Sequence, residues 1–161
     1  MLGQKVLLNQ MPIAIKDSKI DISSEETTKE LAKDLTHYLK GGEIVYLYGE
    51  MGVGKTTFVR HLINQFQKNK KLHITEVTSP TFNLLNEYDI NDLVIKHYDL
   101  FRLKDESEIK NLDLFENNQS TITLIEWPQL ISKNKSIKTI DLIFSYENEL
   151  NNRSVKIDGL N

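Results

Sequence analysis

The sequence predicts a three-layer α/β fold with a mixed central β-sheet, and three observations support this prediction. Short apolar runs rich in β-branched and aromatic residues, typical of buried strands, alternate with segments of helical spacing. Residues 49–56 match the phosphate-binding pattern G-x-x-x-x-G-K-[ST] without a mismatch. Strand-like runs at 82–88 and 93–100 flank turn residues at 89–92, which predicts an antiparallel hairpin and therefore a sheet that is not purely parallel. Together these features indicate a fold like that of the P-loop NTPases.

The segment before the glycine-rich stretch predicts an edge strand and a helix. Residues 20–22 alternate apolar and polar, as in a short edge strand. Ser23 and Glu26 fit a capping box with Ser23 as the N-cap, and an apolar stripe predicts a helix over 25–39. Gly41-Gly42 is expected to end that helix and to lead into the next strand.

The glycine-rich stretch itself lies between a predicted strand and a predicted helix. Residues 44–48 are apolar and β-branched or aromatic, and large apolar side chains recur at every fourth position over 58–66. Glycines there allow several backbone N–H groups to point at one phosphate, and the helix N-terminus adds partial positive charge. Lys55 is expected to reach the β- and γ-phosphates, and the Thr56 hydroxyl is expected to ligate Mg²⁺. The segment therefore predicts nucleotide binding.

The remainder of the chain predicts further strands, one short helix and a second hairpin. A strand is expected at 74–78, followed by a loop in which Pro80 imposes extended or turn geometry on Ser79. Acidic residues at 105–108 predict a short helix, because negative charge is favourable in a first helical turn. Strand-like runs follow, of which the last two form a terminal hairpin: 121–125, 138–146 and 153–157.

Composition excludes several classes of function. The net charge of −3 argues against a general basic surface for binding tRNA or DNA directly. The chain has no cysteine, which excludes disulfides and thiol catalysis, and no apolar run approaches the ~20 residues of a membrane span. We expect a cytoplasmic protein, monomeric when isolated and without membrane contact. A single P-loop domain is expected over 19–161, preceded by a flexible extension over 1–18 that is a poor signal peptide.

Three residues are candidates for organising a metal ion, a water molecule or the γ-phosphate. Glu126 directly follows an apolar strand, at the sheet edge where α/β proteins collect ligands, and Asp99 lies near the end of the run at 93–100. Either acid could contact the metal shell while the other positions water, and the sequence leaves both assignments open. Thr81, in the Pro80 loop, is a candidate γ-phosphate sensor, the alternative being a turn hydroxyl that bonds its own backbone.

Two absences refine the prediction. The four histidines show no metal-ligand spacing, so structural roles are expected for them. GTPases usually carry an Asn-Lys-x-Asp base clamp, but here Asn69-Lys70 is followed by Lys71-Leu72, and Asn134-Lys135 by Ser136-Ile137. The missing aspartate favours ATP over GTP.

Four sequence blocks occur in a specific order: GEMGVGKTTF at 49–58, SPTF at 79–82, HYDLFRL at 97–103 and EWP at 126–128. The first block alone is shared by many families. In combination and at this chain length, the blocks resemble the TsaE (YjeE) ATPases, which take part in tRNA threonylcarbamoyladenosine biosynthesis. The resemblance covers roughly residues 20–157.

This resemblance implies an ATP site and a set of site residues. Phosphate binding would involve the loop and the helix start, namely Glu50, Met51, Gly52, Val53, Gly54, Lys55, Thr56 and Thr57. Mg²⁺ would be held at Thr56 and Glu126, Asp99 would be important for turnover, and Thr81 would lie in a switch-like loop. By the same similarity, the adenosine would be bordered by Glu25, Gln129 and Arg153.

The resemblance also implies an ATP hydrolase that is weak alone and is stimulated by partners. Those partners would be TsaB and TsaD, which transfer the threonylcarbamoyl group to A37 of tRNA, so that tRNA is met only indirectly. ATP hydrolysis would drive or reset that assembly. One alternative is a P-loop small-molecule kinase, which usually needs an Arg-rich lid and is disfavoured by a chain with only three arginines. The other is a non-catalytic ATP-binding switch, against which intact Lys55, Thr56 and Glu126 argue.

Overall fold

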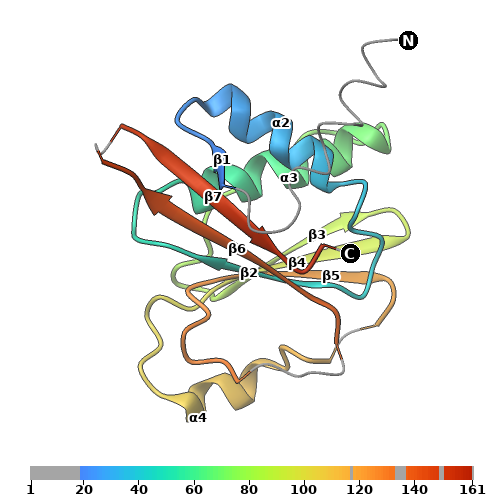
Figure 1. The fold of residues 1–161 in the computed structure, drawn as a ribbon. Helices are drawn as coiled ribbons and strands as arrows, with labels where there is room; N and C mark the ends of the chain where they lie inside the picture. The colour runs from blue at the N-terminus through green and yellow to red at the C-terminus, as the bar shows by residue number, and fades with distance from the viewer. Residues whose placement is uncertain (1–18, 117, 133–136, 149–150, 161) are drawn as a thin grey trace.

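A computed structural model describes residues 19–116, 118–132, 137–148 and 151–160 of the chain. These residues form one seven-stranded sheet in the order β1-β7-β6-β2-β5-β4-β3, with helices packed against it (Figure 1). The extension predicted over 1–18 lies outside the described residues.

The strands are β1 (Lys19–Asp21), β2 (Ile44–Tyr48), β3 (Leu85–Ile90), β4 (Leu93–Asp99), β5 (Thr121–Glu126), β6 (Thr139–Tyr146) and β7 (Arg153–Asp158). The helices are α2 (Glu25–Leu35), α3 (Lys55–Asn69), α4 (Glu106–Ile109) and the 3-10 helix η2 (Lys110–Leu112).

The sheet is mixed, as predicted. The central strand β2 runs parallel to both β5 and β6, and β4 runs parallel to β5. The hairpins β3–β4 and β6–β7 and the edge pair β1–β7 are antiparallel. Because β2, β4 and β5 point the same way, their carboxyl ends meet at one edge of the sheet, where the phosphate loop leaves β2.

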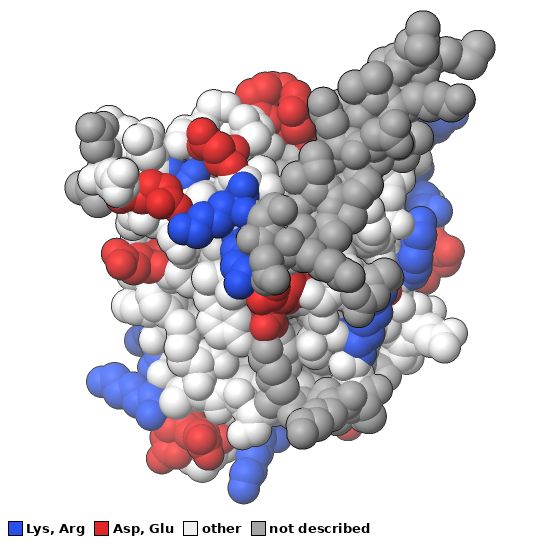
Figure 2. Space-filling view, viewed as in Figure 1, with Lys and Arg blue, Asp and Glu red and all other residues white. Residues whose placement is uncertain are grey.

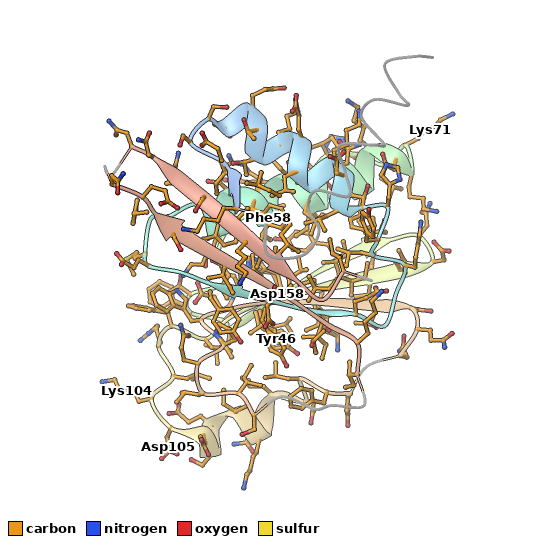
Figure 3. The ribbon with its side chains drawn as sticks, in the orientation of Figure 1. Tyr46, Phe58, Lys71, Lys104, Asp105 and Asp158 are labelled. Carbon is orange, nitrogen blue, oxygen red and sulfur yellow. The ribbon has the colours of Figure 1, made fainter. Side chains whose placement is uncertain are left out.

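The two faces of the sheet are covered differently. Helices α2 and α3 pack on one face, and Phe58 of α3 is fully buried between helix and sheet (Figure 3). Burying one such side chain contributes about 2–3 kcal/mol. The other face, onto which Tyr46 projects, is covered by α4, η2 and the loops beside them. The predicted three layers are therefore present, and the second covering layer is mostly loop.

The first helix begins at Glu25 as predicted, but its N-cap and its end differ from the prediction. The N-cap of α2 is Ser24, whose hydroxyl accepts a hydrogen bond from the Thr27 N–H at 3.2 Å, so the prediction of Ser23 was wrong by one residue. The Ser23 hydroxyl instead accepts from the Arg153 N–H at 3.0 Å and ties the helix start to β7. The helix ends at Leu35 rather than at 39, and the chain continues in turns that keep Leu39 buried.

The strand predicted at 74–78 is absent. Side-chain amides of α3 take the place of a strand partner there: Gln67 Oε1 accepts from the Thr75 N–H at 3.2 Å, and Asn64 Nδ2 donates to the Thr75 carbonyl at 3.0 Å. The next strand begins at Leu85 rather than at 82, because Leu84 has a φ of 66°, which interrupts an extended run. The strand at 74–78 is missing because of polar contacts with α3, and β3 begins late because of the backbone conformation of Leu84; hydrophobic patterning reports neither.

Acidic and basic side chains are interspersed over the face shown in Figure 2, in line with the net charge of −3. The short helix α4 forms as predicted, with Glu106 and Glu108 in its first turn. Asp105 is its N-cap, and the Asp105 carboxylate accepts from the Ser107 N–H at 3.0 Å (Figure 3). Within the described ranges, no helix combines the length and the apolar character needed to cross a bilayer.

Candidate functional site

A cavity of about 360 Å³ opens at the carboxyl edge of β2, β4 and β5. Most of the predicted site residues line it: Met51, Gly52, Gly54, Lys55, Thr56, Thr57, Thr81, Asp99, Glu126 and Arg153. Three further residues line it as well: Ser79, Phe101 and Trp127. Segments that lie far apart in the sequence therefore converge on one hollow.

Strand register brings the two candidate acids together. Asp99 of β4 pairs with Glu126 of β5, and Glu126 pairs on its other side with Leu47 of β2. Both acids end their strands, and both are buried, with exposed fractions of 6% for Asp99 and 2% for Glu126. Because side chains alternate along a strand, the two carboxylates lie on the face that carries α3. The helix that follows the phosphate loop therefore begins directly beside them.

The phosphate loop depends on glycine at Gly49. This residue has a φ of +145°, and an added Cβ would lie 2.9 Å from the Phe144 Cβ and 2.9 Å from a methyl group of Val53. A side chain at this position would therefore meet both a strained backbone and atoms that are already packed. Val53 is itself fully buried, so it supports the loop from behind and does not line the cavity.

Gly49→Ala is expected to lower the free energy of unfolding by about 3 kcal/mol, from an overpacking cost of about 1–3 kcal/mol and a backbone cost of about 1–2 kcal/mol. Urea unfolding measures this change. Gly42→Ala is the matched control, because Gly42 has a φ of +94° but its added Cβ would have no neighbour closer than 3.9 Å. Equal destabilisation by the two substitutions would contradict the packing argument.

Lys55 lies at the floor of the cavity. The residue is 4% exposed, its Nζ donates to the Gly49 carbonyl, and the same nitrogen lies 3.5 Å from the centroid of the Trp127 ring. Burial lowers the pKa of Lys55 below its ordinary value, and the nearby carboxylates of Glu126 and Asp99 partly oppose this shift. Trp127 has a φ of 58°, a strained conformation for a bulky residue that is found most often at functional sites.

Glu126 is held by two side chains. Its Oε1 accepts a hydrogen bond from the Thr56 hydroxyl at 3.0 Å, and the same hydroxyl lies 3.3 Å from Oε2. Oε2 also lies 2.7 Å from Nε2 of His97. His97 is a site residue that sequence reasoning missed, because histidines were sought only as metal ligands. The signal that could have found it is strand alternation, which places His97 two residues before Asp99 on the same face of β4.

Asp99 is bound mainly to the loop that carries Thr81. Its Oδ2 accepts from the Ser79 hydroxyl, and its Oδ1 accepts from the Phe101 N–H at 3.0 Å. Thr81 is half-buried in that loop and lines the cavity. Asp99 therefore ties the Pro80 loop to the end of β4.

Besides Val53, three of the predicted contacts with nucleotide lie away from the cavity lining. Glu25 pairs with Arg60 at 2.8 Å and with His61 at 2.9 Å, and its side chain is 62% exposed. Glu50 and Gln129 are exposed and do not line the cavity. Of the residues expected to border the adenosine, only Arg153 lines the cavity.

The donor set suits Mg²⁺. Hydroxyl and carboxylate oxygens of Thr56 and Glu126 converge within 3.0 Å of each other, and Mg²⁺ usually combines one or two such groups with phosphate oxygens and water. The described residues contain no cluster of three or more His, Cys, Asp or Glu side chains able to hold a metal by themselves. A cation here would therefore need phosphate oxygens to complete its coordination.

Comparisons with known proteins agree with one another. A family model described as "Threonylcarbamoyl adenosine biosynthesis protein TsaE" matches residues 22–155. A Rickettsia conorii protein named "tRNA threonylcarbamoyladenosine biosynthesis protein TsaE" is 44% identical over 68% of this chain, but the match spans only 61% of that relative's length. A Bacillus subtilis protein of the same name is 36% identical over 74% of this chain and 72% of its own.

The fold also matches a solved structure. The crystal structure of Bacillus subtilis YdiB superposes with a TM-score of 0.66, covering 91% of this chain and 87% of that one. At 21% sequence identity, this likeness concerns the fold alone.

Proposed function

Because the chain belongs to the TsaE family, we propose that it is the ATP-hydrolysing subunit of the machinery that makes N6-threonylcarbamoyladenosine at A37 of tRNA. It would act in the cytoplasm and drive or reset a TsaB–TsaD transfer assembly. One observation supports this proposal most strongly: Lys55, Thr56 and Glu126 meet at the end of the phosphate loop within one cavity.

The chain's own residues account for ATP binding. Backbone N–H groups of the loop and the N-terminus of α3 would hold the phosphates, and Lys55 would exchange the Gly49 carbonyl for a phosphate oxygen. Thr56 and Glu126 would hold Mg²⁺, which neutralises charge on the β- and γ-phosphates when bound. Among the side chains that line the cavity, Lys55 and Arg153 carry positive charge that would face a triphosphate, and Asp99 and Glu126 carry negative charge.

The contacts favour different roles for the two acids. Glu126 contacts the Thr56 hydroxyl, so we assign to it the role of holding the Mg²⁺ beside the γ-phosphate. Asp99 holds Ser79 and the neighbouring loop, so we assign it the placement of Thr81 and of the attacking water. Hydrolysis would proceed by in-line attack of that water on the γ-phosphorus, with ADP as the leaving group.

The rim of the cavity supports a protein partner. Three large apolar side chains are exposed there or beside it, with fractions of 64% for Met51, 84% for Phe82 and 47% for Phe101. Exposed apolar groups around a polar site are typical of a surface that another protein covers. The net charge of −3 fits a chain that meets tRNA only through its partners.

The test is phosphate release from Mg·ATP by the purified chain, alone and with TsaB and TsaD from the same organism. We expect slow release by the chain alone and strong stimulation by the pair. ATP that binds tightly without any stimulated release would support the non-catalytic switch instead. Consumption that required a small acceptor molecule would support the kinase.

A further inference from the structure

His97 is a buried polar side chain to which the proposed function gives no role. His97 is completely buried, and its Nε2 lies 2.7 Å from Glu126 Oε2. Its other ring nitrogen, Nδ1, has no hydrogen-bond partner among the described residues. The contact with Glu126 is therefore the one hydrogen bond that this ring makes in that part of the chain.

The surroundings of His97 offer no other reason for a polar ring. It pairs in register with Leu124 of β5, and Ile95 precedes it on the same face of β4, both fully buried. Its partner on β3 is Asn86, whose side-chain amide donates to the Thr78 carbonyl at 3.2 Å. An apolar side chain would pack there without leaving a ring nitrogen unpaired in the core. The benefit of histidine at this position therefore lies in its hydrogen bond to Glu126.

The direction of this hydrogen bond follows from the chemistry of the two groups. An ionised carboxylate only accepts, so the proton between them belongs to Nε2. The opposite tautomer would leave a buried N–H without an acceptor and would set two acceptors against each other. His97 is thus the donor, and Oε2 of Glu126 is occupied by it.

We propose that His97 is a positioning residue whose Nε2–H holds Oε2 of Glu126 so that Oε1 stays directed at Thr56 and at the Mg²⁺ of a bound nucleotide. This inference rests on the proposed function. When the Thr56 hydroxyl turns its lone pair to a cation, Oε1 loses its donor at 3.0 Å and Oε2 loses the longer contact of 3.3 Å with the same hydroxyl. The hydrogen bond between Oε2 and His97 remains. The carboxylate would therefore stay oriented while its free oxygen accepts from the metal or from a metal-bound water.

Three substitutions separate this role from simple packing. His97→Gln places an amide N–H close to the position of the original Nε2. The side chain of His97→Asn is too short for its amide to reach Glu126, and His97→Leu removes the donor. Ile95→Ala is the matched control, because it disturbs the same buried face of β4 without touching Glu126. Thermal unfolding of every variant shows which of them keep the fold.

The readout is the affinity for a fluorescent ADP analogue, measured with Mg²⁺ and again in excess EDTA. Removing a side chain that hydrogen-bonds to a metal ligand typically lowers metal affinity 10- to 100-fold. The gain is the ratio of the ADP affinity with Mg²⁺ to the ADP affinity in EDTA. We expect this ratio to be roughly tenfold smaller in His97→Leu and His97→Asn than in the wild type, while the affinity in EDTA stays unchanged. His97→Gln should keep most of that gain, and Ile95→Ala should lose stability but keep the gain.

The outcomes of this experiment distinguish a failure of the positioning role from a failure of the proposed function. A wild-type chain whose ADP affinity did not respond to Mg²⁺ would overturn the proposed metal site and this inference with it. A Mg²⁺ response that is normal in the wild type and unchanged in folded His97→Leu would overturn the positioning role alone. The positioning role would also be overturned if His97→Gln, His97→Leu and Ile95→Ala all lost the Mg²⁺ response to the same extent.

Discussion

Replacing Lys55 with alanine is expected to lower partner-stimulated ATP hydrolysis by about 10²- to 10³-fold, the usual cost of removing one preorganised charge from a transition state. The Lys55 ammonium lies at the floor of the cavity beside the phosphate loop, where charge would develop on the transferred phosphoryl group under the proposed function. Steady-state phosphate release at saturating Mg·ATP measures the effect. Nucleotide affinity is expected to fall as well, because the same ammonium would contact the phosphates of the bound nucleotide.

Stability separates this effect from misfolding. Burial lowers the pKa of Lys55, so its charged form is disfavoured in the folded state. This cost lowers the free energy of unfolding at pH values below the lowered pKa. It is relieved as the pH rises from that pKa toward the ordinary pKa of lysine. Lys55→Met keeps the bulk that packs beside Trp127 and removes the charge, so it should lose hydrolysis without losing stability. Lys68→Ala, an exposed lysine on the same helix, is the matched control. Near-normal release by folded Lys55→Met would refute the assignment.

Replacing Glu126 with glutamine is expected to lower hydrolysis by about 10²-fold or more while leaving Mg²⁺-free nucleotide binding intact. The substitution keeps the shape of the side chain but removes the charge that faces Thr56. It also sets an amide N–H₂ against the Nε2–H of His97 unless the amide turns over. Parallel measurements of phosphate release and of ADP affinity in EDTA report the two expectations.

Glu43 offers a matched control for this substitution. It is a buried carboxylate at the opposite end of β2, where Oε1 accepts from the Gly41 N–H at 2.8 Å. Glu43→Gln is therefore expected to reduce stability but to leave hydrolysis per folded molecule unchanged. Asp99→Asn should slow turnover with a smaller change in Mg²⁺ dependence, because Asp99 contacts Ser79 rather than Thr56. If Asp99→Asn abolished the Mg²⁺ response and Glu126→Gln did not, the two acids would exchange roles.

Local sequence was sufficient for the elements that carry their own signal. The strand at 44–48, the helix over the apolar positions of 58–66 and the terminal hairpin were all predicted, because hydrophobic periodicity reports which face is buried. The phosphate loop was readable for a similar reason, since its backbone needs glycine and its chemistry needs Lys55 and Thr56 at a set spacing. Glu126 was predicted from its place at the end of an apolar strand.

Other features depended on contacts between segments remote in sequence. The N-cap of α2 moved to Ser24 because Ser23 bonds to β7, and no strand formed at 74–78 because side chains of α3 satisfy that backbone. The hydrophobic periodicity of one segment does not indicate which polar groups of another segment will bond to it.

The division is clearest at the site. The order of residues along the chain is enough to identify a phosphate loop, two candidate acids and a tryptophan next to one of them. Folding adds the pairing of β4 with β5, which sets Asp99 beside Glu126 and brings His97 within 2.7 Å of that carboxylate. Folding also pairs Glu25 with Arg60, away from the cavity lining. The physical reason is that spacing along a strand determines the face on which a side chain lies, whereas its neighbour across the sheet depends on strand order and register.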